Sequence, residues 1–184
     1  MERRELFKIL TSGLAAPPYL SAQHRHSENS PPPLRSYQPR FFSRAEYEVI
    51  DRLCEIIIPS DQESPGAHQS GVPYYIDTIL LYSDKRSLQP LWRSGLEAVK
   101  ETSVAQFGKG FLECSAPQQE QIVALMASHE GMPSNELEKF FGRLKAMAIE
   151  GYLLSDIGMS QHLGYKGNQV LFEFPGCTHP EHQT

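Results

Sequence analysis

The sequence predicts an all-α protein, a single domain of about five main helices followed by an irregular C-terminal tail rich in glycine and proline. Three observations support this fold class. Apolar residues recur every three or four positions in several long segments, as on the buried face of a helix. Capping residues, glycines and prolines separate these segments. No run of alternating β-branched residues between turns predicts a strand.

The first helix is predicted to begin after Ser43. Ser43 and Glu46 have the spacing of a capping box, in which each side chain accepts the other residue's backbone N–H. Pro59 cannot continue the backbone ladder and disfavours a helical Ile58, so the helix should end there. The predicted buried stripe consists of Ile50, Leu53, Cys54, Ile57 and Ile58.

Two more helices follow a polar loop. Pro73 suits the first turn of the second helix, because an N–H has no helical partner at that position. The third helix is predicted over residues 87–107, and Gly108 can adopt the left-handed conformation that ends it. The residues expected to give the helical period are Val72, Tyr75, Ile76, Ile79, Leu80 and Ser83 in the second helix, and Leu88, Leu91, Trp92, Leu96, Val99 and Phe107 in the third.

The last two helices also begin at capping residues. Ser115 and Gln118 form a second predicted capping box, and Gly131 with Pro133 should close the helix that follows. Ser134 is expected to cap the longest stripe. The apolar residues are Ile122, Leu125 and Met126 in the fourth helix, and Leu137, Phe140, Phe141, Leu144, Met147 and Tyr152 in the fifth.

The composition describes one domain with a leader. The chain has 184 residues, a net charge of −5 and 40% hydrophobic residues. It has no basic patch of the kind that binds nucleic acid. No apolar run approaches the roughly 18 to 20 residues that span a bilayer, so membrane association is expected only through partners. Three separate cysteines without a C-x-x-C or C-x-x-C-H motif argue against an iron–sulfur cluster or covalently bound haem.

Residues 1–22 have the layout of an export signal, with a charged start, a short apolar middle and small residues near the end. An arginine pair before two bulky apolar residues and a lysine is typical of the twin-arginine signature. These residues are Arg3, Arg4, Leu6, Phe7 and Lys8. The alternative is the basic first helix of a cytosolic protein. Residues 23–40, with three consecutive prolines, predict an extended linker, and residues 41–184 the helical domain with its tail from about 155.

Several segments in order resemble one family. They are RRELFK, FFSRAEYEVIDRLCEIIIPSD, PGAHQSGVPYYID, GLEAVKETSVAQFGKGFLE and FF-x7-IEGYLLSD, followed by GYKGN and GC. Together they resemble the small subunit of gluconate 2-dehydrogenase. The resemblance extends over nearly the whole chain and depends on the order and spacing of the segments.

This resemblance implies a non-catalytic accessory subunit of a periplasmic flavoprotein dehydrogenase. The expected partner is a large FAD-containing subunit, usually accompanied by a cytochrome subunit with haem c. The small subunit of this family carries no redox centre. It is expected to escort its folded partner through the twin-arginine export route.

The tail is expected to contact that partner. Residues 155–177 carry large apolar side chains on a glycine-rich segment with little helical period. The predicted partner contacts are Tyr165, Phe172, Phe174 and Cys177. Cys177 is a candidate for an intersubunit disulfide, whereas Cys54 and Cys114 are expected to be packed thiols. The alternative is that the aromatic residues cover the ends of the chain's own helices.

Two groups of residues offer chemistry of their own. Cys177, His179 and His182 lie within six positions, and His162 precedes them, so a zinc site can be drawn. The alternative is a solvated tail with incidental histidines, and we predict no metal site. The candidate acids and bases are Asp61, Asp77, Glu150 and Asp156, each of which has a structural explanation as a turn, helix-dipole or capping residue.

Three functional hypotheses therefore follow from the sequence. The first is the accessory subunit that escorts a flavin dehydrogenase. The second is a small metal-dependent or acid–base enzyme on a helical scaffold. The third is a cytosolic helical adaptor. No nucleotide-binding, phosphate-binding or nucleophile-elbow motif occurs in the chain, which argues against an independent enzyme.

Overall fold

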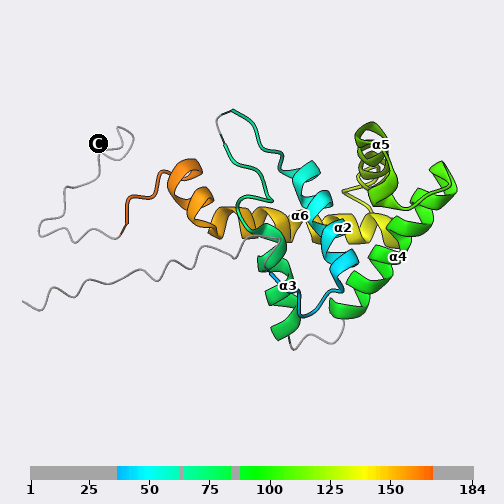
Figure 1. Ribbon diagram of the computed structural model, residues 1–184, viewed down its shortest axis with the longest axis horizontal. Helices are drawn as coiled ribbons and strands as arrows, with labels where there is room; N and C mark the ends of the chain where they lie inside the picture. The colour runs from blue at the N-terminus through cyan, green and yellow to red at the C-terminus, as the bar shows by residue number, and fades with distance from the viewer. Residues whose placement is uncertain (1–36, 63, 84–87, 168–184) are drawn as a thin grey trace, which may run out of the picture.

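The computed structural model describes residues 37–62, 64–83 and 88–167, which form only helices and connecting loops (Figure 1). The elements are α2 (Arg44–Ile57), α3 (Val72–Tyr82), α4 (Leu88–Phe107), η1 (Phe111–Glu113), α5 (Ala116–Met126), α6 (Glu136–Leu154) and the π-helical turn η2 (Gly158–His162). The predicted all-α class with about five main helices is confirmed. None of these helices is long and apolar enough to cross a membrane.

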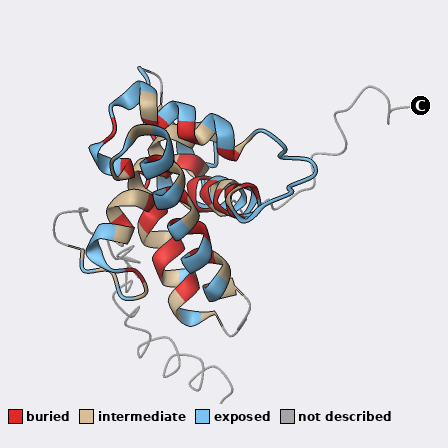
Figure 2. Ribbon diagram, turned by 90° about the vertical axis from the view of Figure 1, so that its right-hand side faces the viewer, coloured by how far each residue is buried: buried red, intermediate tan, exposed pale blue. Residues whose placement is uncertain are grey.

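The long helix α6 is the central support of the fold (Figure 1). It packs against α4, α3, α2 and α5, and the turn η2 follows it at the end away from α4 and α5. Buried residues recur along each of the main helices and are coloured red on the ribbon in Figure 2. The largest of them are Trp92, Phe140, Ile50, Leu53, Ile76, Leu80, Ile122, Met126 and Leu144.

Most of the predicted helix ends are confirmed. Glu46 N–H donates to Ser43 Oγ, and Ser43 N–H donates to Glu46 Oε2 at 2.7 Å, which completes the first capping box. Ser115 N–H donates to Gln118 Oε1 at 3.0 Å at the start of α5. Gly108 has a φ of 70°, the left-handed conformation expected at the end of α4.

The cap of α6 is one residue later than predicted. Asn135, not Ser134, is the N-cap, and its side chain accepts the Glu138 N–H at 2.9 Å. Glu138 turns back and accepts the backbone N–H and the hydroxyl of Ser134, at 2.7 and 2.9 Å. These bonds, together with His129 and Ser128, lower the pKa of Glu138 to about 2. Ser134 therefore supports the cap through Glu138.

Two apolar residues of the predicted helical patterns are exposed, and one predicted helix end is wrong. Ile79 and Leu125 are 40% and 44% exposed, because the core covers only the neighbouring stripe of each helix. Helix α5 ends at Met126, before the predicted stop at Gly131 and Pro133. Ser128 ends it early, because its hydroxyl and backbone N–H both bond to the Leu125 carbonyl.

The crossing of α4 and α6 depends on a glycine. A Cβ atom added at Gly95 would lie 2.2 Å from Cγ of Phe140, so only glycine allows this approach of the two helices. Phe140 also packs edge-to-face on Trp92, with ring centroids 5.3 Å apart. Gly95 thereby makes room for the aromatic contact at the centre of the core.

We predict that Gly95→Ala lowers the free energy of unfolding by about 3 kcal/mol, because the new methyl group forces α4 away from α6. Gly142→Ala is the matched control. Its Cβ would meet nothing within 4 Å, so the loss of glycine from a helix should stabilise the protein by about 0.5 to 1 kcal/mol. Urea unfolding followed by circular dichroism measures both changes, and equal changes in the two variants would contradict the crossing.

Candidate functional site

A single buried carboxylate fixes the start of the described chain. Asp77 is fully buried and accepts four hydrogen bonds from the segment before α2. Its Oδ2 accepts from Tyr37 Oη at 2.7 Å and Arg40 N at 2.9 Å. Its Oδ1 accepts from Phe41 N at 3.1 Å and Phe42 N at 2.9 Å. The four donors replace the water that an isolated carboxylate would need.

This role of Asp77 differs from the sequence-based expectation. The position early in a helix suggested an interaction with the helix dipole, whereas the side chain binds a segment 35 to 40 residues away in sequence. Burial and the neighbouring Asp77 raise the pKa of Tyr37 far above its usual range, so its phenol keeps the proton that it donates. Tyr37 also packs against Tyr47 and Tyr74, with ring centroids 5.4 and 4.9 Å apart.

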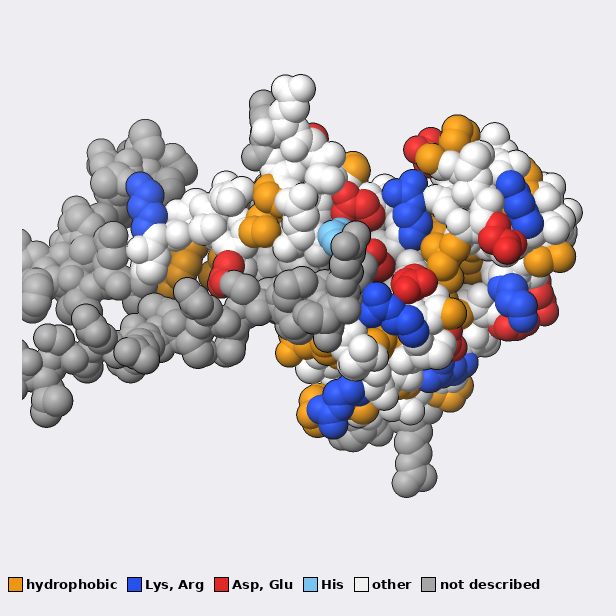
Figure 3. Space-filling model, viewed as in Figure 1, with side chains coloured by type: hydrophobic (Ala, Val, Ile, Leu, Met, Phe, Trp, Pro, Cys, Tyr) orange, Lys and Arg blue, Asp and Glu red, His pale blue; other side chains and the backbone are white. Residues whose placement is uncertain are grey.

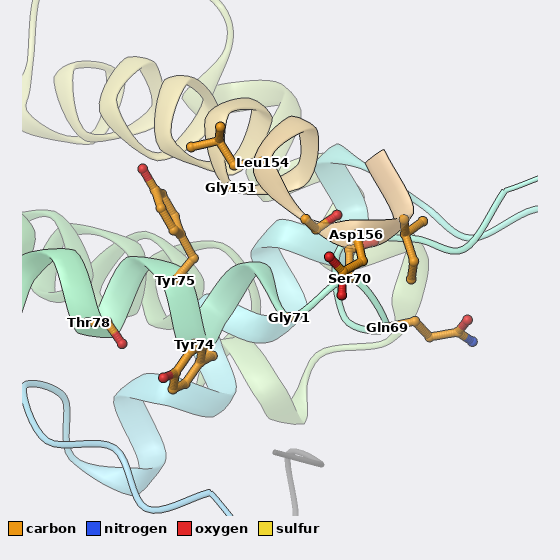
Figure 4. A pocket seen from close by; sticks show the side chains of 11 residues that line it. Gln69, Ser70, Gly71, Tyr74, Tyr75, Thr78, Gly151, Leu154 and Asp156 are labelled. Carbon is orange, nitrogen blue, oxygen red and sulfur yellow. The ribbon is translucent and has the colours of Figure 1, made fainter. Parts of the chain in front are cut away.

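A hollow of about 340 Å³ opens between α3 and α6, beside this anchored segment. We call it the α3–α6 hollow. It is lined by Gln69, Ser70, Gly71, Tyr74, Tyr75, Thr78, Gly151, Leu154, Ser155, Asp156 and Ile157. Figure 4 shows Tyr75 rising from α3 toward Gly151 and Leu154 of α6, with Asp156 beside Ser70 at the other end. Tyrosine rings and one carboxylate thus face a surface cavity.

Close contact between α3 and α6 shapes this hollow. A Cβ at Gly151 would lie 2.7 Å from Cδ1 of Tyr75, so the glycine lets the ring approach α6 closely. Burial, a hydrogen bond to Glu150 and its negative charge raise the pKa of Tyr75 to about 12. The Tyr75 hydroxyl is therefore a hydrogen-bond donor at neutral pH, and Glu150 serves to orient it.

The loop before α3 is held by acidic residues of α2, a feature that sequence reasoning missed. Glu55 accepts the backbone N–H groups of Ser60 and His68, at 3.0 and 2.9 Å. Asp51 contacts Nδ1 of His68 at 2.8 Å. The spacing of Asp51 and Glu55, one helical turn apart, was the available signal, but their partners could not be read from it. The pair holds the loop that forms one wall of the α3–α6 hollow.

A second hollow of about 290 Å³ lies between α2, α4 and η1. Its apolar lining includes Val49, Leu96 and Leu112. Figure 3 shows hydrophobic side chains gathered between charged ones over α2 and α4. Arg93 pairs with Glu46, and Lys100 pairs with Glu97. Glu113 also lines this hollow and accepts the Gly110 N–H at 2.8 Å.

Many of the predicted site residues lie outside the described residues. These are Arg3, Arg4, Leu6, Phe7 and Lys8 of the leader, Phe172, Phe174 and Cys177 of the tail, and His179 and His182. The imidazole of His162 is not described either. Tyr165 is described and is 46% exposed, with its backbone N–H bonded to the Met159 carbonyl. The described residues contain no group of three potential metal ligands.

The candidate acids differ in their contacts. Asp61 closes a turn by accepting the Ser64 N–H at 2.7 Å, as predicted. Asp156 is not the cap of the segment after α6, because Ser155 Oγ accepts the Gly158 N–H instead, at 3.0 Å. Cys54 and Cys114 are buried free thiols, which confirms the prediction, and burial raises the pKa of Cys54 far above its usual range.

The described helices form a small all-helical bundle with hollows on its surface. Within that class, the chain belongs to the gluconate 2-dehydrogenase subunit 3 family, whose model matches residues 44–175. This match confirms the resemblance seen in the sequence. Membership implies a small subunit of a dehydrogenase complex, associated with the other gluconate dehydrogenase subunits. No curated protein and no solved structure matches the chain.

We predict that Asp77→Asn lowers the free energy of unfolding by about 2 to 3 kcal/mol, because the amide nitrogen cannot accept from the donors that face it. Tyr37→Phe removes one of the four hydrogen bonds and should cost about 1 kcal/mol. Urea unfolding midpoints give both values. If Asp77→Asn cost no more than Tyr37→Phe, the carboxylate would not be the anchor of this segment.

Proposed function

We propose that this chain is a non-catalytic accessory subunit that binds, stabilises and escorts a large FAD-containing dehydrogenase to the periplasm. The observation that carries the proposal is the family match over residues 44–175, which covers every described helix. In this proposal FAD belongs to the large subunit and haem c to a cytochrome subunit. This chain supplies contacts between proteins, and its candidate acids serve the fold.

The leader supports the export part of the proposal. Arg3 and Arg4, followed by Leu6, Phe7 and Lys8, form an address that a transport receptor would read. The twin-arginine route carries folded proteins, so a partner without its own signal could travel only when bound to this chain. We therefore propose twin-arginine export of the assembled pair.

The tail supports the docking part. Tyr165, Phe172 and Phe174 are proposed as anchors on the large subunit, because aromatic side chains give a large buried area for few rotatable bonds. Cys177 would form an intersubunit disulfide after export. Tyr165 is 46% exposed.

Export is tested by replacing both Arg3 and Arg4 with lysine. This change keeps the charge but should remove the receptor address, so that the chain and its flavoprotein partner both stay in the cytoplasm. Fractionation and immunoblotting measure the distribution. Arg35→Lys, a conservative change outside the leader, is the control and should leave export unchanged. Normal export of the partner with the Arg3 and Arg4 variant would disprove the escort function.

Docking is tested by deleting residues 168–184. The buried core of the described residues lies between Phe42 and Tyr152, so the deletion should leave the thermal transition unchanged. Co-purification of the FAD-containing subunit should be lost, because the proposed anchors Phe172 and Phe174 are gone. A retained complex would show that docking occurs elsewhere, and a lower transition temperature would show that the tail belongs to the core.

A further inference from the structure

The α3–α6 hollow lies beside the first described residue of the chain. Tyr37 packs edge-to-face on Tyr74, with ring centroids 4.9 Å apart, and Tyr74 lines the hollow. The Tyr37 hydroxyl is fixed by Asp77, and Arg40 N–H bonds to the same carboxylate oxygen. The described chain therefore begins at the rim of this cavity.

The lining of the hollow suits a proline-rich segment. Tyr74 and Tyr75 supply aromatic surface, and Leu154, which is 61% exposed, supplies apolar surface opposite them. Aromatic-lined grooves bind proline-rich segments, because such segments are already extended and lose little conformational entropy on binding. The residues just before Tyr37 read PPPLRS, from Pro31 to Ser36.

The charges of the hollow and of the segment before Tyr37 are complementary. Asp156 is the only charged side chain among the described residues that line the hollow. Glu150 lies beside the hollow, because it is hydrogen-bonded to the lining residue Tyr75. Between Pro31 and Tyr37 the only charged residue is Arg35. A guanidinium can pair with a carboxylate through two hydrogen bonds, so Arg35 fits an acidic end of the cavity.

The length of the linker matches the length of the hollow. The hollow follows α3 from Gly71 to Thr78, which corresponds to about 10 Å at ~1.5 Å per residue. A polyproline II segment rises ~3.1 Å per residue, so four residues before Tyr37 cover about 12 Å. The six residues 31–36 are therefore long enough to cross the hollow while Tyr37 stays on Tyr74.

We propose that residues 31–36 of this chain dock in the α3–α6 hollow as a polyproline II segment, with Arg35 directed toward Asp156. The inference does not depend on the proposed escort function. Docking makes the end of the linker part of the domain surface and directs the preceding residues toward the end of α6. The free part of the linker then stops near Ser30.

Limited proteolysis of the full-length chain with trypsin tests this docking. Trypsin can cut after Arg25 and after Arg35, and mass spectrometry measures the rate at each bond. Docking should slow cleavage after Arg35 by about tenfold relative to Arg25, because the protease cuts only the undocked population. The hollow variant Leu154→Gln/Asp156→Asn should abolish this protection by removing apolar surface and charge at exposed positions.

The control variant Leu125→Gln/Glu120→Gln likewise changes one leucine and one acidic residue, at exposed positions of α5 away from the hollow. It should keep the wild-type ratio of the two rates, including any protection due to Tyr37 alone. Replacing prolines 31–33 with serine should also speed cleavage after Arg35 by about tenfold. In the hollow variant the same replacement should not increase the cleavage rate further, because both changes remove the same contact between the linker and the hollow.

Three outcomes would overturn the proposal. Equal cleavage after Arg35 in the hollow and control variants would show that the linker does not bind there. Protection that develops only when the FAD-containing subunit is added would assign the hollow to that partner. Additive effects of the proline and hollow changes would count against direct contact in the same way.

Discussion

The Asp77 carboxylate is the interaction on which the arrangement of the helices depends. It accepts the backbone N–H groups of Phe41 and Phe42, which immediately precede α2, and so holds the Phe42 ring in the core. That ring packs on Trp92, with centroids 5.9 Å apart, and Trp92 packs on Phe140 of α6. One buried charge on α3 is thus connected through three aromatic rings to the central helix.

Glycines provide the second constraint, because they set how closely α6 approaches its neighbours. Gly95 admits the Phe140 ring between α4 and α6, and Gly151 admits the Tyr75 ring between α3 and α6. In both places an aromatic ring fills the space that a Cβ atom would occupy. The first contact lies in the core and the second at the edge of the α3–α6 hollow. The same kind of glycine–aromatic contact therefore occurs both in the interior and at the surface.

Local signals made most of the fold predictable from the sequence. Capping boxes and helix stops act within four residues, and Ser43 with Glu46 is found as predicted. Asp77 could not be assigned in this way, since its donors lie 35 to 40 residues earlier and their identity depends on tertiary packing. The exposure of Ile79 could not be predicted either, because a helical period identifies an apolar stripe but not which part of it the core covers. Most of the predicted partner contacts cannot be compared with the structure, because they lie outside the described residues.

The sequence separation of the Asp77 anchor has a consequence for synthesis on the ribosome. The segment from Tyr37 to Phe42 leaves the ribosome before its acceptor, which follows 35 to 40 residues later. At ~5–20 residues per second this gap lasts about 2 to 8 s. During that interval the N-terminal segment has no acceptor on the domain. Attachment of this segment therefore requires α3 but not α4, α5 or α6, which follow Asp77 in the chain.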